Sequence, residues 1–384
     1  MRNAFLLDPD LVFLNHGSFG ACPREVFRAY RHWQLELERN PVAFLGRRSA
    51  QLLLGARRVL ADRVGASAED LVFLPNATTG VNTVARSMTL QAGDEVVTTD
   101  HEYGACEAAW RFVCAERGAV YRPLSLPLPF DADDAVQRIT AALSPRTRVL
   151  YLSHITSTTA LILPVADLCA EARRRGITTV VDGAHAPGQI EIDLEAIGAD
   201  FTTGNCHKWL CAPKGAAFLH ARAERHAELH AAVVSWGYAV GDGGHSGFDA
   251  YTGHTLLERR LQWQGTRDIA AFLAVPAAIE FQDRHSWPAL RQRCHAMAIE
   301  TRNRVLSRNG LQPIAADSAH AQMVPIPVRT DDGDALRRWL FDQHRIEVPV
   351  IQHGEQRFVR VSVQAYNTQA DLDALVQALA EAGV

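Results

Sequence analysis

The chain has 384 residues, of which 47% are hydrophobic and 21% are charged. That composition excludes a disordered, collagen-like or low-complexity chain, and the length predicts two or three domains. With 39 basic and 43 acidic side chains the net charge is −4, which excludes a general attraction to nucleic acid or anionic lipid. No apolar run reaches the length of a membrane span, and an acid at position 8 argues against a signal peptide. We therefore expect a soluble, cytoplasmic protein that binds neither nucleic acid nor membrane.

Short apolar runs alternate with longer amphipathic stretches from residue 50 to about residue 220. The predicted strands are Leu71–Leu74, Glu95–Thr99, Arg148–Ser153, Thr178–Asp182, Phe201–Thr203 and Ala216–His220. The predicted helices between them are Ala50–Val64, Gly80–Met88, Glu107–Glu116 and Val165–Arg175. Strands separated by helices predict an α/β fold with a mostly parallel sheet that is covered on both faces. Ligands of such sheets collect at the carboxyl ends of the strands.

The C-terminal third has a different pattern. Residues 236–268 are rich in glycine and aromatic side chains and predict a long functional loop, and residues 269–307 predict helices. Strands near Gln322–Val328 and Phe358–Val363 and a helix from Thr368 to Glu381 predict a smaller α+β unit. We therefore predict a large domain over residues 30–260. The small domain combines residues 261–384 with residues 1–29, which include an N-terminal substrate loop.

Metal-binding patterns are missing from the sequence. The seven cysteines are scattered and form no CxxC pair, and the sixteen histidines include no HExxH. We expect no metal site and buried, inert thiols.

Two polar residues follow predicted strands and suggest a cofactor site. Asp182 comes directly after one strand, and Lys208 follows the next strand along the chain. A lysine whose pKa is lowered by apolar surroundings can form a Schiff base, and a carboxylate opposite it can hold a pyridinium nitrogen. Pyridoxal phosphate needs both groups. The strand–helix turn Asn76–Gly80 offers free backbone amides to its phosphate.

Segments across nearly the whole chain resemble those of the class V aminotransferase-like enzymes of pyridoxal-phosphate fold type I, most closely the isopenicillin N epimerase-like branch. The resembling segments are Phe13–Gly20 (FLNHGSFG), Asn76–Gly80 (NATTG), Asp100–Tyr103 (DHEY), Asp182–His185 (DGAH), His207–Trp209 (HKW), Pro213–Gly215 (PKG), Gln264–Thr266 (QGT), Val359–Ser362 (VRVS) and Tyr366–Asn367. The resemblance implies the large domain with a mixed, mostly parallel sheet and the smaller C-terminal α+β domain.

The resemblance also implies roles for individual residues around pyridoxal 5′-phosphate. Lys208 is expected to be the Schiff-base lysine and the proton shuttle at the substrate α-carbon. The other expected cofactor contacts are Asp182 at the pyridine nitrogen, His185 near the phenolic oxygen, Ser157 at the polar edge of the ring, and Ala77, Thr78, Asn205, His207 and Thr266 at the phosphate. His101 is expected to stack on the ring, with Tyr103 as the alternative; either is also a candidate acid or base.

Three further residues are expected to contact an amino acid substrate. Arg360 lies on a predicted strand, and its guanidinium suits a bidentate clamp on the α-carboxylate. Asn15 and His16 are further candidates from the N-terminal loop. The phosphate contact from Thr266 is expected to come from a second subunit. This implies a homodimer with its active site at the interface, and the 236–266 loop is the segment expected to cross it.

The reaction stays open among several outcomes at the α-carbon. Epimerisation is placed first on the branch resemblance. The alternatives are β-elimination by a C–S lyase of the hercynylcysteine sulfoxide lyase type and transamination by a class V aminotransferase. A persulfide-type cysteine desulfurase is argued against, because residues 348–357 before Arg360 hold no cysteine.

Overall fold

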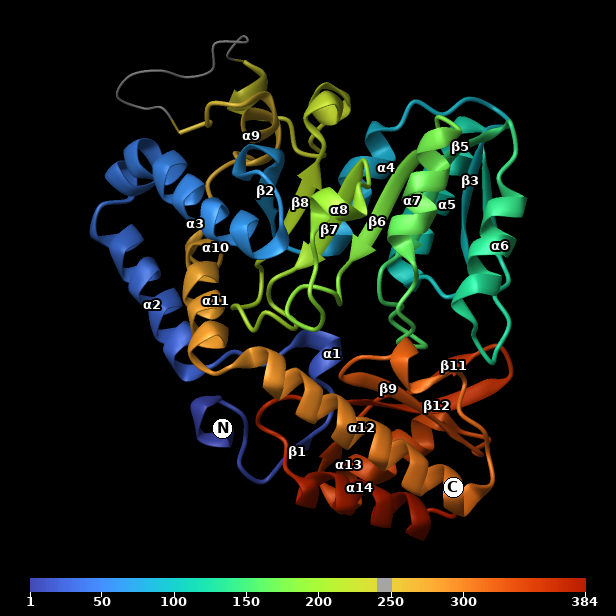
Figure 1. The fold of residues 1–384 in the computed structure, drawn as a ribbon. Coiled ribbons are helices and arrows are strands. Elements are labelled where there is room, and N and C mark those ends of the chain that lie inside the picture. The colour runs from blue at the N-terminus through green and yellow to red at the C-terminus, as the bar shows by residue number, and fades with distance from the viewer. Residues whose placement is uncertain (240–250) are drawn as a thin grey trace.

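A seven-stranded sheet forms the centre of the larger part of the molecule (Figure 1). The computed structural model describes residues 1–239 and 251–384. The strands in chain order are β2 (Leu71–Leu74), β3 (Glu95–Thr99), β4 (Val120–Leu124), β5 (Thr147–Ser153), β6 (Thr178–Gly183), β7 (Phe201–Asn205) and β8 (Ala217–Ala221). Their order in the sheet is β2-β8-β7-β6-β5-β3-β4. Strand β8 runs antiparallel to both of its neighbours, β2 and β7, and the other neighbouring strands pair in parallel. The predicted mixed, mostly parallel sheet is therefore confirmed.

Helices cover both faces of this sheet. Successive side chains of a strand point to opposite faces, and on this sheet both faces carry apolar side chains. On β5, Leu150 and Leu152 pack in one hydrophobic cluster, whereas Val149 and Tyr151 pack in the other. The first cluster includes residues of α2 (Arg24–Arg39), α3 (Ser49–Val64), α6 (Ala132–Ala142), α7 (Val165–Arg174), α8 (Leu194–Ile197), α10 (Ala270–Leu273) and α11 (Val275–Arg284). The second includes residues of α4 (Ala77–Ser87), α5 (Gly104–Arg117) and α9 (Leu256–Leu261).

A second, smaller sheet lies beside the carboxyl ends of the large one (Figure 1). It has the order β11-β12-β9 and is antiparallel, and its helices are α12, α13 and α14. The bounds are β9 (Met323–Val328), β11 (Val350–His353), β12 (Gln356–Ser362), α12 (Trp287–Asn309), α13 (Gly333–His344) and α14 (Gln369–Glu381). The N-terminal strand β1 (Val12–Phe13) pairs in parallel with β10 (Ile346–Glu347) and leads into the short helix α1 (His16–Phe19). The start of the chain therefore joins its C-terminal third, while the division at residues 30 and 260 stays a prediction.

Several local expectations are confirmed and others need correction. Helix α14 begins with the capping box of Thr368 and Asp371, as its sequence predicts. Helix α4 begins at Ala77 rather than Gly80, because the Asn76 side chain caps it. Strand β4 was not predicted, since it is a half-exposed edge strand that contains Pro123. Among the described residues, no helix is both long and apolar enough to span a bilayer.

Candidate active site

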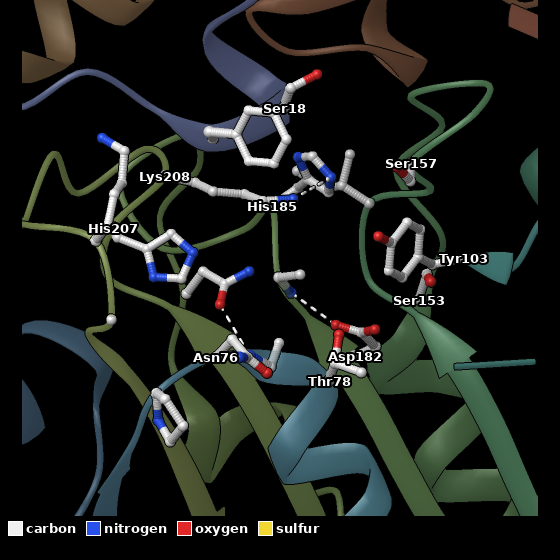
Figure 2. A pocket seen from close by; sticks show the side chains of 18 residues that line it. Ser18, Asn76, Thr78, Tyr103, Ser153, Ser157, Asp182, His185, His207 and Lys208 are labelled. Carbon is white, nitrogen blue, oxygen red and sulfur yellow. Dashed lines mark hydrogen bonds between the residues drawn. The ribbon is translucent and has the colours of Figure 1, made fainter. Parts of the chain in front are cut away.

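One cavity of about 410 Å³ opens at the carboxyl ends of the central strands (Figure 2). It brings together residues that lie far apart in the sequence, because each follows a neighbouring strand. The expected site residues that line it are Ala77, Thr78, Tyr103, Ser157, Asp182, His185, Asn205, His207 and Lys208. The lining also includes Lys214, and Asp182 is its one acidic residue. Its charge therefore suits an anionic ligand.

Asp182, the last residue but one of β6, lies at the floor of this cavity and is almost completely buried. The backbone N–H of Ala184 donates to its Oδ1 at 2.9 Å. The hydroxyl of Tyr151 and the thiol of Cys106 both donate to Oδ2, at 3.3 and 3.5 Å. Burial raises the pKa of Asp182, while these hydrogen bonds and the nearby Lys208 lower it. A cationic group in the cavity would stabilise this buried carboxylate.

Lys208 follows β7 and directs its amine to the side chain of His185, with 3.1 Å between Nζ and Nε2. Burial and, to a smaller extent, the charge of Arg360 lower the pKa of Lys208 to about 8, against the opposing effect of Asp182. Burial also holds the pKa of His185 well below its usual value, so its ring is neutral at pH 7. At that pKa roughly a tenth of Lys208 is the neutral amine at pH 7, and the neutral amine is the nucleophilic form of a lysine.

The N-terminus of α4 forms another wall of the cavity. The side chain of Asn76 accepts from the backbone N–H of Thr79 at 2.8 Å, and Asn205 accepts from that of Ala77 at 2.9 Å. The Nδ1 of His207 donates to the carbonyl of Ala216 at 2.8 Å. Burial lowers the pKa of His207 to about 4, so Nε2 carries a lone pair at pH 7 and could donate to an anion only if the anion raised that pKa. Although the amides of Ala77 and Thr79 are already bonded, the positive dipole of the helix and the side chain of Thr78, which lines the cavity, suit a phosphate at this wall.

Arg360, on β12 of the small sheet, is not itself among the residues that line the cavity, but it contacts two that are, Ser157 and Ser18. Its Nη1 donates to the backbone carbonyl and hydroxyl of Ser157, and its Nη2 lies 3.3 Å from the hydroxyl of Ser18. Its Nε has no hydrogen-bond partner, although Arg360 is only 5% exposed. Burial lowers its pKa to about 10. A buried guanidinium whose partners are neutral is suited to bind a carboxylate.

His101, which was expected to stack on the cofactor or to act in catalysis, lies outside the cavity. His101 is buried and does not line the cavity. Its Nδ1 lies 2.8 Å from the hydroxyl of Thr159, and its Nε2 donates to the carbonyl of Leu126 at 3.1 Å. His353 covers its ring at a centroid distance of 4.0 Å. The alternative, Tyr103, is 46% exposed and lines the cavity.

Asp100 lies close to this stacked histidine pair, and the ligand atoms of the three residues lie within 4.8 Å of one another. The sequence reasoning missed this group. The two rings are inclined by only 25°, so their in-plane lone pairs run nearly parallel and do not converge on one point. The group is therefore poorly arranged to hold an ion.

The two expected substrate contacts of the N-terminal loop lie behind the cavity rather than in it. His16 is fully buried, with one ring nitrogen 3.0 Å from the Tyr366 hydroxyl and the other 3.0 Å from the Lys208 carbonyl. Asn15 accepts a hydrogen bond from Ser18 at 2.6 Å. Both expectations are corrected: His16 supports the backbone of Lys208, and Asn15 acts through Ser18, which lines the cavity.

Thr266 lies outside the cavity of its own chain and is exposed. The loop that was expected to cross a subunit interface spans residues 236–266, and its residues 240–250 lie outside the described residues.

Several residues of the site were missed from the sequence. Ser18 and Phe19 line the cavity from α1, and Ser153 lines it from the end of β5. Cys106 and Tyr151 lie beneath Asp182. The resembling segment Phe13–Gly20 contains Ser18 and Phe19. No pattern in the sequence indicates that Tyr151 of β5 and Cys106 of α5 lie beneath Asp182.

Comparisons with known proteins agree with this geometry. The chain matches the family Aminotransferase class-V over residues 13–375. It is 40% identical to the isopenicillin N epimerase of Amycolatopsis lactamdurans, over 99% of this chain and 97% of that protein. It is 30% identical to a probable chloroplastic L-cysteine desulfhydrase of Arabidopsis thaliana, over 97% of this chain and 83% of that protein. A solved complex of a cystine C–S lyase with cysteine persulfide has a TM-score of 0.84 at 23% identity, covering 97% of this chain and 98% of that one.

Proposed function

The chain belongs to the class-V aminotransferase family, and we propose that it is a pyridoxal 5′-phosphate enzyme that inverts the configuration at the α-carbon of an amino acid. The observation that carries this proposal is the pairing of Lys208 and Asp182 in one cavity, with Tyr103 in the same lining. The identity of 40% to an isopenicillin N epimerase, over nearly the full length of both chains, supports epimerisation as the reaction.

The residues present fit this cofactor. Asp182 is a buried carboxylate that a pyridinium nitrogen would neutralise, and Lys208 has an amine of lowered pKa for the aldehyde. Thr78, Asn205 and His207 lie around the N-terminus of α4, where the phosphate would be held. When bound, the cofactor withdraws electrons from the α-carbon of the amino acid and so acidifies its C–H bond.

Epimerisation needs one group that removes the α-proton and another that returns a proton to the opposite face. Lys208 Nζ, as a neutral amine, is the proposed acceptor. The hydroxyl of Tyr103 is the proposed donor, and its exposure of 46% lets solvent return its proton between turnovers. Arg360 is proposed to hold the substrate carboxylate and so fix which bonds of the α-carbon face these two groups. Ser157, hydrogen-bonded to Arg360, is proposed to hold the polar edge of the cofactor ring.

A C–S lyase is the second candidate function. The support for it is the identity of 30% to a probable L-cysteine desulfhydrase over 97% of this chain. In that reaction Tyr103 would protonate the departing sulfur instead of the α-carbon. A persulfide mechanism remains disfavoured, because the cysteine nearest Asp182 is Cys106, whose thiol is buried and has its pKa raised by burial.

The experiment that separates these reactions is incubation with a panel of L- and D-amino acids in deuterated water. Epimerisation predicts deuterium at the α-carbon and formation of the opposite enantiomer, without pyruvate or ammonia. Stoichiometric pyruvate would support the lyase instead. Tyr103→Phe is expected to abolish formation of the opposite enantiomer while leaving cofactor affinity unchanged, because the ring is kept.

Borohydride reduction tests the lysine itself. It should fix the cofactor on Lys208 in the native enzyme, and Lys208→Ala should remove this attachment. Attachment that persists in Lys208→Ala would overturn the assignment. Lys214→Ala is a matched control, since Lys214 lines the same cavity and should leave the attachment to Lys208 intact.

We also propose a cytoplasmic homodimer in which Thr266 of one subunit reaches the phosphate held by the other. Thr266 is exposed and lies outside the cavity of its own chain, which supports this arrangement. Mixed dimers of Lys208→Ala and Thr266→Ala subunits test it. If Thr266 acts across the interface, such a dimer has one intact site and regains activity that both parents lack. If it acts within its own chain, each mixed site carries one defect and no activity returns.

A further inference from the structure

Trp209 and His185 form a buried hydrogen-bonded pair next to Lys208. The indole Nε1–H of Trp209 donates to Nδ1 of His185 at 3.2 Å. The other ring nitrogen of His185, Nε2, lies 3.1 Å from Lys208 Nζ. Trp209 is 0% exposed and His185 is 2% exposed, so water does not compete for either bond. Three side chains therefore form one chain of hydrogen bonds that ends on the amine.

The direction of these bonds follows from the chemistry of the first donor. An indole N–H can only donate, so Nδ1 of His185 must carry a lone pair. A neutral imidazole has a single N–H, which must then be on Nε2. The bond to Lys208 therefore runs from His185 Nε2–H to a lone pair on Nζ, and only a neutral amine has that lone pair. An ammonium at Lys208 would require His185 to accept at both nitrogens, which a neutral ring cannot do.

We propose that Trp209 is a positioning residue that fixes His185 as its Nε2–H tautomer and thereby favours the neutral amine of Lys208 over the ammonium. Neutral lysine is the form that attacks an aldehyde. Only the use of that amine rests on the proposed function; the tautomer itself does not. Trp209 directly follows Lys208 in the chain, so one short segment carries both the amine and the group that determines its protonation.

The charges around the pair support the same protonation state. Lys208 faces Arg360 on β12, Asp182 on β6 and Cys106 on α5. His185 faces Lys208, Arg360 and His16, the last on α1. Arg360 is a permanent cation next to both groups and disfavours a proton on either, whereas Asp182 favours one on Lys208. The pKa values of Lys208 and His185 are both lowered, so both groups are shifted toward their neutral forms.

Long-range ¹H–¹⁵N NMR of the ¹⁵N-histidine-labelled full-length enzyme reads the tautomer directly. His185→Gln assigns the signals. The wild-type apoenzyme should show the Nε2–H tautomer, and Trp209→Phe should shift His185 to the Nδ1–H tautomer or a mixture. Trp287→Phe is the matched control, because Trp287 is also buried and donates to the carbonyl of Gly188 at 3.2 Å. A wild-type Nδ1–H tautomer overturns the proposal, even if Trp209→Phe does not fold.

The pH dependence of cofactor uptake gives a second readout. The rate at which apoenzyme takes up pyridoxal 5′-phosphate should rise with a midpoint near the lowered pKa of Lys208, about 8. In Trp209→Phe the midpoint should move up by about one pH unit, so the rate at pH 7 falls about tenfold. Trp287→Phe should leave the midpoint unchanged. An unshifted midpoint in a folded Trp209→Phe enzyme overturns the proposal. If uptake fails in the wild type, the proposed function fails, while the NMR result still tests the tautomer.

Discussion

Tyr151 Oη lies 3.3 Å from Asp182 Oδ2 and donates a hydrogen bond to it beneath the cavity. This bond lowers the pKa of Asp182, which burial raises. Tyr151→Phe should raise that pKa further and weaken retention of pyridoxal 5′-phosphate by roughly tenfold or more, since hydrogen bonds to charged groups contribute about 1.5–3 kcal/mol. The dissociation constant of the cofactor, measured by absorbance titration, checks this result.

Two cysteines of helix α5 provide the comparison for that prediction. Cys106→Ala should weaken cofactor binding in the same direction but less, because a thiol is a weaker donor than a hydroxyl. Cys114→Ala removes a buried thiol of the same helix and should leave the dissociation constant unchanged. Unchanged affinity in Tyr151→Phe would show that Asp182 does not depend on this bond.

Arg360→Lys tests the carboxylate clamp. Lysine keeps the charge but lacks the planar fork, so affinity for an amino acid should fall by about 10- to 100-fold, corresponding to roughly 1.5–3 kcal/mol. The dissociation constant follows from the absorbance change on adding the amino acid to the cofactor-loaded enzyme. The same amino acid as its amide should bind both enzymes equally, because it lacks the carboxylate.

Arg357→Lys, on the same strand, is the matched control for the clamp. Arg357 donates to the carbonyl of Thr330, away from the cavity. Its substitution should leave substrate affinity unchanged. Equal losses in the two variants would point to a general disturbance of β12 rather than to a carboxylate contact.

Gly20→Ala should disturb the backbone of His207 and Lys208. Gly20 has a φ of +71°, and a Cβ there would lie 2.2 Å from the carbonyl oxygen of His207 and 2.9 Å from Cα of Lys208. Gly93 has a φ of +83° with nothing within 4 Å, so Gly93→Ala isolates the conformational cost, about 1 kcal/mol. Gly20→Ala should lower the free energy of unfolding by roughly 2–3 kcal/mol and also weaken cofactor binding. Urea denaturation measures the free energy of unfolding of both variants. Equal losses in Gly20→Ala and Gly93→Ala would contradict the close approach of Gly20 to the backbone of His207 and Lys208.

Acid should destabilise the protein through its buried histidines. Burial lowers the pKa of His320 from 6.5 to about 4, so the unfolded chain binds a proton between these values while the folded protein does not. The free energy of unfolding therefore falls as the pH drops below 6.5. His320 alone contributes about 2 kcal/mol of this loss by pH 5, and His320→Gln should remove that share of the difference between urea denaturation at pH 7 and pH 5.

His226 should have the opposite effect on the same measurement. Its pKa is raised through its contacts with Asp70, 3.0 Å away, so its contribution to stability is present in acid and is lost as the pH rises through its folded pKa. His226→Gln should therefore enlarge the loss of stability between pH 7 and pH 5 by a small amount, because the pair is only half-buried. A smaller loss in this variant would contradict the sign.

The strands of the central sheet could be predicted because each is a short apolar run between helical patterns. Six of its seven strands were located within one or two residues, and the edge strand β4 was missed because it is half-exposed and contains a proline. The residues that follow β2, β6 and β7 could also be predicted to meet, since the carboxyl ends of parallel strands share one edge.

Side-chain orientation behind that edge could not be predicted. His101 and Tyr103 are two residues apart, and which ring faces the cavity depends on His353 of the small sheet, which covers His101. Likewise, His16 lies in a motif of the N-terminal loop but points inward to Tyr366 and the Lys208 carbonyl. These orientations are set by contacts between segments hundreds of residues apart, which a local pattern does not encode.

The pairing of β1 with β10 has a consequence for synthesis of the protein. Val12 pairs with Ile346, so the partner of the first strand leaves the ribosome only after 334 further residues have been synthesised. Until then the segment from Asn15 to Gly20 lacks its neighbours in the small sheet, and the wall that it forms around the lysine is incomplete. The cavity is therefore completed only once the small sheet has been synthesised, and a nascent chain that carries the central sheet alone still lacks one wall of its cofactor site.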